Sequence, residues 1–197
     1  MTKSGYLDGA RMAGAFNMLR PNDLIWSTVV KNYLLGEDYS AFDLLHWNGD
    51  VTNLPAKWHR DYLCDLYRDN KLVEPDAMSA LGTPIDLTRV KTPTYIQAGR
   101  EDHIAPAQSA WKIRDHFSGP TRFVLAGSGH IAGVVNPPAA QKYQYWTNDA
   151  EVHSFHEFVE GAAETKGSWW PDWIEWLAKQ GADKVKAEQA RVPGKGK

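Results

Sequence analysis

The most constraining feature of the 197-residue sequence is a strand, a helix and a second strand in tandem between residues 94 and 126. Thr94–Ala98 is a short β-rich run after Pro93, and Thr121–Ala126 is another. A helical stretch over Pro106–Phe117 separates them, with Pro106 near its first turn. A connection of this kind joins two parallel strands through a right-handed crossover. The second half of the chain is therefore predicted to be an α/β domain with a parallel sheet.

The first part of the chain has a helical pattern. Apolar residues recur at spacings of three and four over Leu7–Leu35. The pattern is interrupted at Pro21–Asp23, where Asn22 or Asp23 is expected to cap the second helix. Gly36 is expected to end that helix.

Four more segments have recognisable patterns. Ala41–Trp47 predicts a short buried strand or an irregular wall segment, and Trp58–Tyr67 predicts a helix. Beyond the paired strands, helices are expected at Phe155–Glu164 and Pro171–Ala178. The last residues are rich in Lys, Ala and Gly and predict a frayed basic tail.

Composition excludes several classes of protein. Hydrophobic residues make up 43% of the chain and charged ones 23%, so an ordinary core is possible. The formal net charge of -2 gives no reason to expect nucleic acid or an acidic membrane as partner. No run of 18 apolar residues exists, so no membrane span is expected, and Met1–Arg11 does not resemble a signal peptide. A single cysteine, Cys64, is consistent with a reducing cytoplasm.

The candidate catalytic residues follow the two predicted parallel strands. The first strand leads into Gly99 and then Asp102, and the second into Gly127 and then His130. Each residue alone has an ordinary explanation, because an Asp after a strand is usually a turn former or a cap. An acid after one strand and a histidine after the next, however, is typical of the C-terminal half of an α/β-hydrolase triad. The acid would fix the imidazole tautomer, and the other ring nitrogen would accept the nucleophile's proton.

The nucleophile of such a triad is missing from these 197 residues. It requires Gly-x-Ser-x-Gly or Gly-x-Cys-x-Gly, because small neighbours permit the strained turn. The two glycine pairs with this spacing begin at Gly5 and Gly129, and they enclose Leu7 and Ile131 instead. Cys64 lies in a helical pattern without flanking glycines and is interpreted as a packing residue.

Other features are assigned structural roles. His103 adjoins Asp102 and is expected to pack or cap. His153 and His156 have no obvious third ligand, so no metal site is predicted. Four tryptophans recur at helical spacing: Trp169, Trp170, Trp173 and Trp176. They suggest either a binding surface or a helix packed on the sheet, and the packed helix is favoured.

Longer motifs resemble those of class I polyhydroxyalkanoate synthases, the poly(3-hydroxybutyrate) polymerases. In chain order these motifs are Leu19–Trp26, Phe42–Asp50, Thr52–Pro55, Arg100–Ile104, Gly127–Pro138, Tyr145–Asn148 and Gly167–Trp173. They cover nearly the whole chain up to the basic tail. The Gly127–Pro138 and Gly167–Trp173 strings are the most specific.

The resemblance implies a division of the chain. Residues 1–78 would be part of a mostly helical cap subdomain, and residues 79–178 the C-terminal half of an α/β-hydrolase core. Residues 179–197 would be a disordered basic tail. The implied triad is Cys-His-Asp, in which Asp102 and His130 match the family's acid and histidine. The family's cysteine lies upstream, so the chain is expected to be a fragment that is inactive alone.

The resemblance also implies substrates and partners. The substrate would be an (R)-3-hydroxyacyl-CoA, such as 3-hydroxybutyryl-CoA, together with the growing polyester, and no separate cofactor is expected. The protein partner would be the missing N-terminal half or another synthase subunit, in the cytoplasm or at the surface of polymer granules. The alternative is a non-catalytic module that binds a full-length synthase or a granule. Intact motifs around Asp102 and His130 favour the enzyme fragment.

Overall fold

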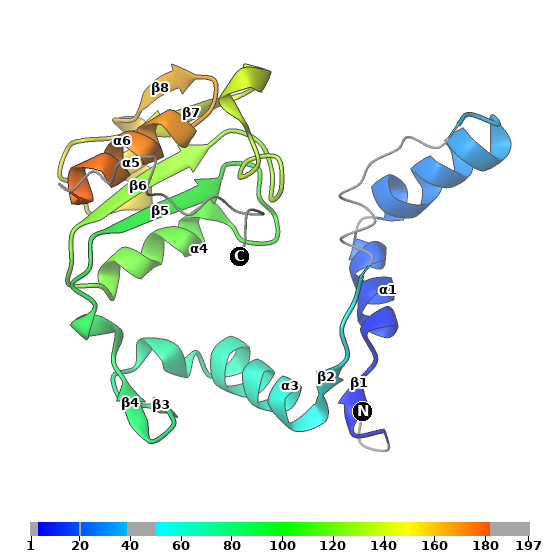
Figure 1. The fold of residues 1–197 in the computed structure, drawn as a ribbon, viewed down its shortest axis with the longest axis horizontal. Coiled ribbons are helices and arrows are strands. Elements are labelled where there is room, and N and C mark those ends of the chain that lie inside the picture. The colour runs from blue at the N-terminus through cyan, green and yellow to red at the C-terminus, as the bar shows by residue number, and fades with distance from the viewer. Residues whose placement is uncertain (1–3, 20, 39–49, 182–197) are drawn as a thin grey trace, which may run out of the picture. The chain divides into compact units, whose positions relative to one another are not determined.

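The computed structural model describes residues 4–19, 21–38 and 50–181 (Figure 1). The chain forms two compact units, Met1–Ser79 and Ala80–Lys197. The segment Ala41–Trp47 lies outside the described residues, as does the predicted tail from residue 182 onward. The assignment of the first unit to a cap subdomain stays a prediction.

The second unit is built on a four-stranded sheet. Its strands are β5 (Thr94–Gly99), β6 (Thr121–Ala126), β7 (Gln144–Thr147) and β8 (Ala163–Lys166), in the spatial order β5-β6-β7-β8. Strands β5 and β6 are parallel and pair in register from Thr94 with Thr121 to Gly99 with Ala126. The predicted pair of parallel strands is confirmed. The sheet as a whole is mixed, because β7 runs antiparallel to both β6 and β8.

The two antiparallel strands were not predicted. The strand β8 reads Ala-Glu-Thr-Lys and is exposed along its whole length, so no apolar alternation marks it. The helix predicted over Phe155–Glu164 is too long, since α5 spans Phe155–Glu160 and its C-cap is Gly161. Its start is fixed by reciprocal capping, in which Ser154 Oγ accepts the Glu157 N–H and Glu157 Oε2 accepts the His153 N–H.

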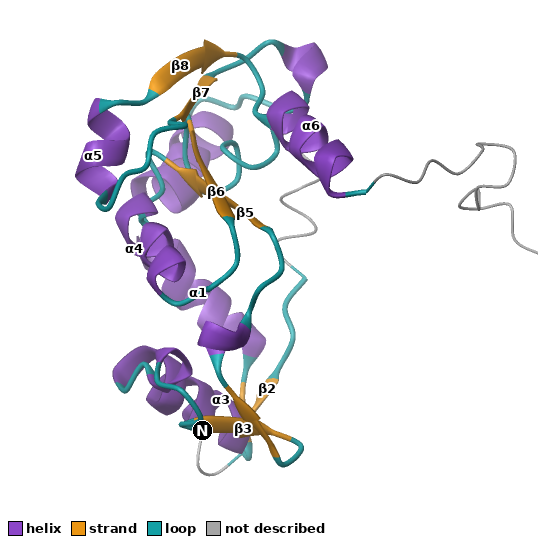
Figure 2. Ribbon diagram, turned by 90° about the vertical axis from the view of Figure 1, so that its left-hand side faces the viewer, coloured by secondary structure: helices purple, strands orange, loops and turns teal. Residues whose placement is uncertain are grey.

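Helices α4 and α5 cover one face of this sheet (Figure 2). The helix α4 spans Ala107–Trp111 and tightens into a 3-10 turn at Lys112–Asp115, so it is more irregular than the predicted Pro106–Phe117. Trp111 and Phe123 meet edge to face with ring centroids 5.0 Å apart. The apolar core on this face consists of Ile96, Ala98, Ala107, Trp111, Phe123, Leu125 and Phe158.

Helix α6, Trp170–Gln180, covers the other face of the sheet (Figure 2). Successive strand residues point to opposite faces, so Val124 and Ala126 pack on this side with Trp169. Tyr95 stacks on Trp169 and meets Trp176 edge-on. The interpretation of these tryptophans as packing residues is therefore confirmed for Trp169 and Trp176. The helix runs two residues beyond its predicted end.

The first unit is mostly helical, as predicted. The short strands β1 (Tyr6–Leu7) and β2 (Leu54–Pro55) pair antiparallel. Its helical segments are α1 (Gly9–Leu19), the π-helical turns Asn22–Trp26 and Val29–Leu34, α3 (Ala56–Tyr62) and the π-helical turn Leu63–Arg68. The predicted cap at Asn22 or Asp23 is wrong. The N-cap residue is Pro21, which has no side chain able to accept a hydrogen bond.

Smaller elements complete the chain. The predicted stop at Gly36 agrees with the structure, because the π-helical turn ends at Leu34 and Gly36 has a φ of 66°. Strands β3 (Met78–Ala80) and β4 (Thr83–Ile85) form a two-stranded ribbon. Single 3-10 turns occur at Lys71–Val73, Leu87–Arg89 and Pro138–Ala140. Within the described ranges, no helix has the length and apolarity needed to cross a bilayer.

Candidate active site

Asp102 is held rigidly by the loop that follows β5. Its Oδ1 accepts the backbone N–H groups of Ile104 and Ala105, both at 2.9 Å. This is the local turn that an Asp side chain forms with residues two and three positions ahead. The side chain is 8% exposed, so it is almost completely withdrawn from solvent. Oδ2 is left to bind a partner from elsewhere.

His130 lies on the loop that follows β6, beside the Asp102 loop. The two loops are joined by a hydrogen bond from the Glu101 N–H to the Ser128 carbonyl, 3.1 Å long. They approach so closely at Gly99 that a Cβ there would lie 3.0 Å from the Ser128 carbonyl oxygen. A glycine at position 99 therefore permits the approach of the two loops.

The structure brings Asp102 and His130 into direct contact. His130 Nδ1 lies 2.8 Å from Asp102 Oδ2, and the imidazole side chain is 48% exposed. Burial opposes ionisation of Asp102, but the N–H of Ala105, the His130 ring and the N–H of Ile104 together hold the pKa of this carboxyl below its ordinary value. An ionised Asp102 favours the tautomer that carries its proton on Nδ1. Nε2 is then an acceptor, as a general base requires.

The two loops also carry exposed aliphatic side chains. The aliphatic side chains of the two loops are about half exposed: Ile104, Ile131, Val134 and Val135. They lie within a few residues of Asp102 or His130 in the sequence. Exposed aliphatic side chains of this kind can contact the hydrocarbon part of a ligand.

Two residues that hold the His130 loop were not identified from the sequence. The indole N–H groups of Trp169 and Trp170 donate to the backbone carbonyls of Gly133 and Val134. The sequence signals here are the adjacent tryptophans and the specific string Gly167–Trp173, and neither predicts a hydrogen bond to another loop. Donation to a loop 36 residues away has no signature in the sequence.

The structure also places the other residues considered from the sequence. Cys64 is partly buried in the π-helical turn Leu63–Arg68 of the first unit. His103 is exposed, with no hydrogen bond among the described contacts. Over the described part of the chain, no three His, Cys, Asp or Glu side chains are grouped so as to hold a metal ion.

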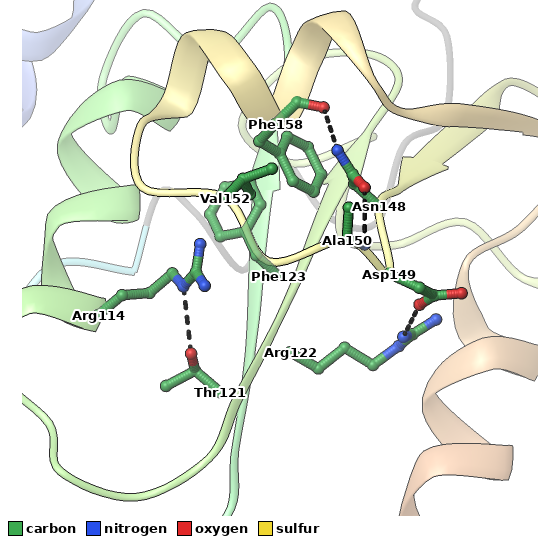
Figure 3. Close-up of a pocket in the computed structure, with 9 residues that line it drawn as sticks. All are labelled: Arg114, Thr121, Arg122, Phe123, Asn148, Asp149, Ala150, Val152 and Phe158. Atoms are coloured by element: carbon green, nitrogen blue, oxygen red, sulfur yellow. Dashed lines mark hydrogen bonds and ion pairs between the residues drawn. The ribbon is translucent and has the colours of Figure 1, made fainter.

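A polar hollow of about 210 Å³ lies at the opposite end of the sheet, around the start of β6 (Figure 3). Its polar groups bind one another, since Arg114 Nε donates to Thr121 Oγ1 at 3.2 Å and Arg122 pairs with Asp149 at 3.0 Å. Asn148 Nδ2 donates to the carbonyl oxygen of Phe158. The hollow contains no pair of an acid and a base comparable with Asp102 and His130.

Comparison with known proteins identifies relatives of the whole chain. Residues 2–137 match the family profile described as alpha/beta hydrolase fold. A poly(3-hydroxyalkanoate) polymerase of Methylorubrum extorquens is 50% identical over 198 residues, which cover 100% of this chain and 32% of the relative. The polymerase subunit PhaC of Cupriavidus necator is 49% identical over 178 residues, 90% of this chain and 30% of the relative. The polymerase subunit PhaC of Rhizobium meliloti is 48% identical over 193 residues, which cover 98% of this chain and 31% of the relative. The chain thus spans about a third of the length of these relatives.

Proposed function

We propose that this chain provides the acid and the base of a polyester-forming acyltransferase. The proposal starts from two findings: the chain belongs to the α/β-hydrolase fold family, and it is homologous to poly(3-hydroxyalkanoate) polymerases. The substrate would be an (R)-3-hydroxyacyl-CoA, with 3-hydroxybutyryl-CoA as the first to test. The observation that carries the proposal is the 2.8 Å contact between His130 Nδ1 and Asp102 Oδ2, in which the histidine side chain stays 48% exposed.

In the first half-reaction, His130 Nε2 takes the proton of a cysteine thiol. The thiolate attacks the thioester carbonyl, the bond from the acyl carbon to the sulfur of CoA breaks, and the departing CoA thiolate receives the proton from His130. Asp102 stabilises the imidazolium in between. The product is an acyl group held as a thioester on the protein.

In the second half-reaction, the 3-hydroxyl of another unit attacks that thioester. His130 takes the hydroxyl proton and returns it to the cysteine sulfur as the new ester forms. The exposed aliphatic side chains on both loops support contact with the hydrocarbon part of the unit. No cofactor beyond the CoA of the substrate enters this scheme.

We further propose that the cysteine comes from residues outside these 197. Two observations support this: the sequence contains no Gly-x-Cys-x-Gly, and the chain spans about a third of its relatives. By itself the chain would then be inactive, and its protein partner would be the segment that carries the cysteine. The polymer product also makes granule surfaces the expected location.

A chimaera tests the proposal. The 178-residue match in the Cupriavidus necator polymerase is replaced with the corresponding part of this chain, and CoA release from 3-hydroxybutyryl-CoA is measured. The chimaera is expected to release CoA and form polymer, whereas the 197 residues alone release none. Turnover by the chain alone would show that it carries its own nucleophile. A folded chimaera without turnover would refute the role of this chain in catalysis.

A further inference from the structure

The far limb of the His130 loop is held by two adjacent tryptophans. The indole N–H of Trp169 donates to the Gly133 carbonyl oxygen at 2.8 Å, and that of Trp170 donates to the Val134 carbonyl oxygen at 3.0 Å. Two neighbouring donors therefore meet two neighbouring acceptors. The acceptors lie three and four residues after His130, so the bonds act on the segment that carries the base.

The loop does not fix its own position. Its internal hydrogen bonds include those from the Gly133 N–H to the Gly129 carbonyl and from the Val135 N–H to the Ile131 carbonyl, both 2.8 Å long. They determine the local shape of the turn but connect it to nothing outside. Further along, Asn136 Nδ2 donates to the Lys142 carbonyl oxygen at 3.0 Å. In the segment between His130 and Asn136, the hydrogen bonds from the two indole N–H groups connect the backbone to the rest of the domain.

Trp169 is itself firmly placed. The residue is 8% exposed, and its ring stacks on Tyr95 of β5 with centroids 6.0 Å apart. It packs in the apolar cluster that contains Val124 and Ala126 of β6. The donor is therefore fixed against the same two strands whose ends carry the Asp102 and His130 loops.

Helix α6 is anchored to the sheet by an ionic network at its first turn. Asp172 Oδ2 accepts from Tyr95 Oη at 2.8 Å and from Arg122 Nε at 3.0 Å. Burial and the neighbouring Asp172 raise the pKa of Tyr95, so its hydroxyl stays a donor. The buried Ser168 Oγ accepts the N–H of Trp170 and orients the chain just before the helix. The position of both indoles is thus set by the sheet.

We propose that Trp169 and Trp170 are positioning residues for His130, which hold the loop so that Nδ1 faces Asp102. What His130 does chemically rests on the proposed function, but its position does not. Packing alone does not account for the pair. Trp173 and Trp176 lie on the same helix, and neither has an indole hydrogen bond among the described contacts.

The ring tautomer of His130 tests this in the full 197-residue chain. Long-range ¹H–¹⁵N NMR, at a pH where the imidazole is neutral, distinguishes a proton on Nδ1 from one on Nε2. A hydrogen bond to ionised Asp102 is expected to favour the Nδ1–H form at least about tenfold. Trp169→Phe and Trp170→Phe keep a ring but remove the donor, and each should lower that ratio severalfold. The matched control is Trp176→Phe, which loses the same atoms from a ring that packs edge-on against Tyr95.

An unchanged tautomer ratio in both variants would overturn the proposal. Because Trp169 is buried and its replacement risks unfolding, Trp170→Phe and a 3-benzothienylalanine at position 169 provide versions that disturb the packing less. The latter keeps the ring shape and replaces only the N–H by sulfur. If the amides of Ile96 and Val124 lose exchange protection in these two versions as well, the tryptophans stabilise the whole domain, and a specific role at His130 is refuted.

Activity separates this inference from the proposed function. In the chimaera, Trp170→Phe is expected to lower kcat about five- to tenfold with little change in KM, because the base and not the substrate site is displaced. If kcat/KM fell by the same factor only because KM rose, a role in positioning the base would be contradicted. A chimaera that is inactive with the natural tryptophans would refute the proposed function and leave the tautomer result standing.

Discussion

The two loops that form the candidate site are held in different ways. The Asp102 side chain is held by its own loop, since Oδ1 is bound by N–H groups two and three residues ahead and the side chain is 8% exposed. The His130 loop is longer, its imidazole side chain is 48% exposed, and the loop is bound by tryptophans 36 residues away in the chain. The acid is therefore fixed locally, whereas the base depends on tertiary structure.

This difference has a consequence for catalysis. An acid that only orients and stabilises its partner tolerates no movement, and a short turn with a buried carboxylate provides that rigidity. A base that must reach a nucleophile and a substrate needs an open face, which the 48% exposure of His130 provides. An exposed side chain is easily displaced, so the position of the loop that carries it must come from distant contacts. Substitutions in the two loops should therefore have different effects.

The largest effect is expected from removing the base. In the chimaera, His130→Ala should lower kcat by about 10⁴-fold, because neither thiol nor hydroxyl has another acceptor for its proton. The matched control is His103→Ala, which removes an exposed imidazole next to Asp102 that makes no described hydrogen bond. Steady-state CoA release measures both. Activity retained in His130→Ala would show that another residue is the base.

A smaller loss is expected from neutralising the acid. Asp102→Asn preserves the size of the side chain, and its amide oxygen still accepts the N–H groups of Ile104 and Ala105. The amide NH₂ would then face Nδ1 and favour the tautomer with the proton on Nε2, so kcat should fall about 10²- to 10³-fold. The long-range ¹H–¹⁵N spectrum of the 197-residue chain should show the change of tautomer directly. A rate within threefold of the natural protein would mean that the charge of Asp102 is not needed.

The same contrast between local and distant contacts decides what the sequence predicts. The strands Thr94–Gly99 and Thr121–Ala126 carry local β propensity and end at glycines, so their existence, parallel pairing and approximate limits were predictable. The placement of Asp102 and His130 at one edge followed from that pairing. The structure shows their direct contact, and their catalytic role stays a prediction.

The missed features depend on partners distant in the sequence. Strand β8, Ala163–Lys166, has no apolar alternation and exists because β7 provides a hydrogen-bonding edge. Asn22 and Asp23 were expected to cap the second helix because Asn and Asp are good capping residues. The π-helical turn instead begins directly after Pro21, so Asn22 is already its first residue. The indole donors of Trp169 and Trp170 are recognisable only once the His130 loop is placed beside them.

A moderate effect is expected inside the histidine loop. In Gly133→Ala the new Cβ would lie 2.7 Å from the Gly129 carbonyl oxygen, so the turn must open and the loop must shift. We expect a loss of about 1–3 kcal/mol in the free energy of unfolding and at least about a tenfold loss of kcat in the chimaera. The control is Gly129→Ala, whose Cβ would meet its nearest neighbour, the Glu101 carbonyl oxygen, at an ordinary 3.7 Å. Equal effects of the two substitutions would show that steric closure at Gly133 does not set the loop.

The smallest effect concerns the acid loop and the dependence of stability on pH. The pKa of Asp102 is lowered in the folded state, against the effect of burial, by the N–H of Ala105, by His130 and by the N–H of Ile104. A lowered folded-state pKa gives stability that is present above the unfolded value of about 3.9 and is lost as the pH falls through the folded value. The free energy of unfolding of the natural protein, measured in urea, should therefore exceed that of Asp102→Asn by less and less as the pH falls below about 4.

Asp172 has a lowered pKa too, because Arg122 and Tyr95 outweigh its burial. It contributes to acid unfolding in both proteins and therefore cancels in the comparison. A difference that stays constant over this range would mean that the carboxylate of Asp102 is no better stabilised in the folded loop than in the unfolded chain. The hydrogen bonds within the Asp102 loop would then not be what holds the acid.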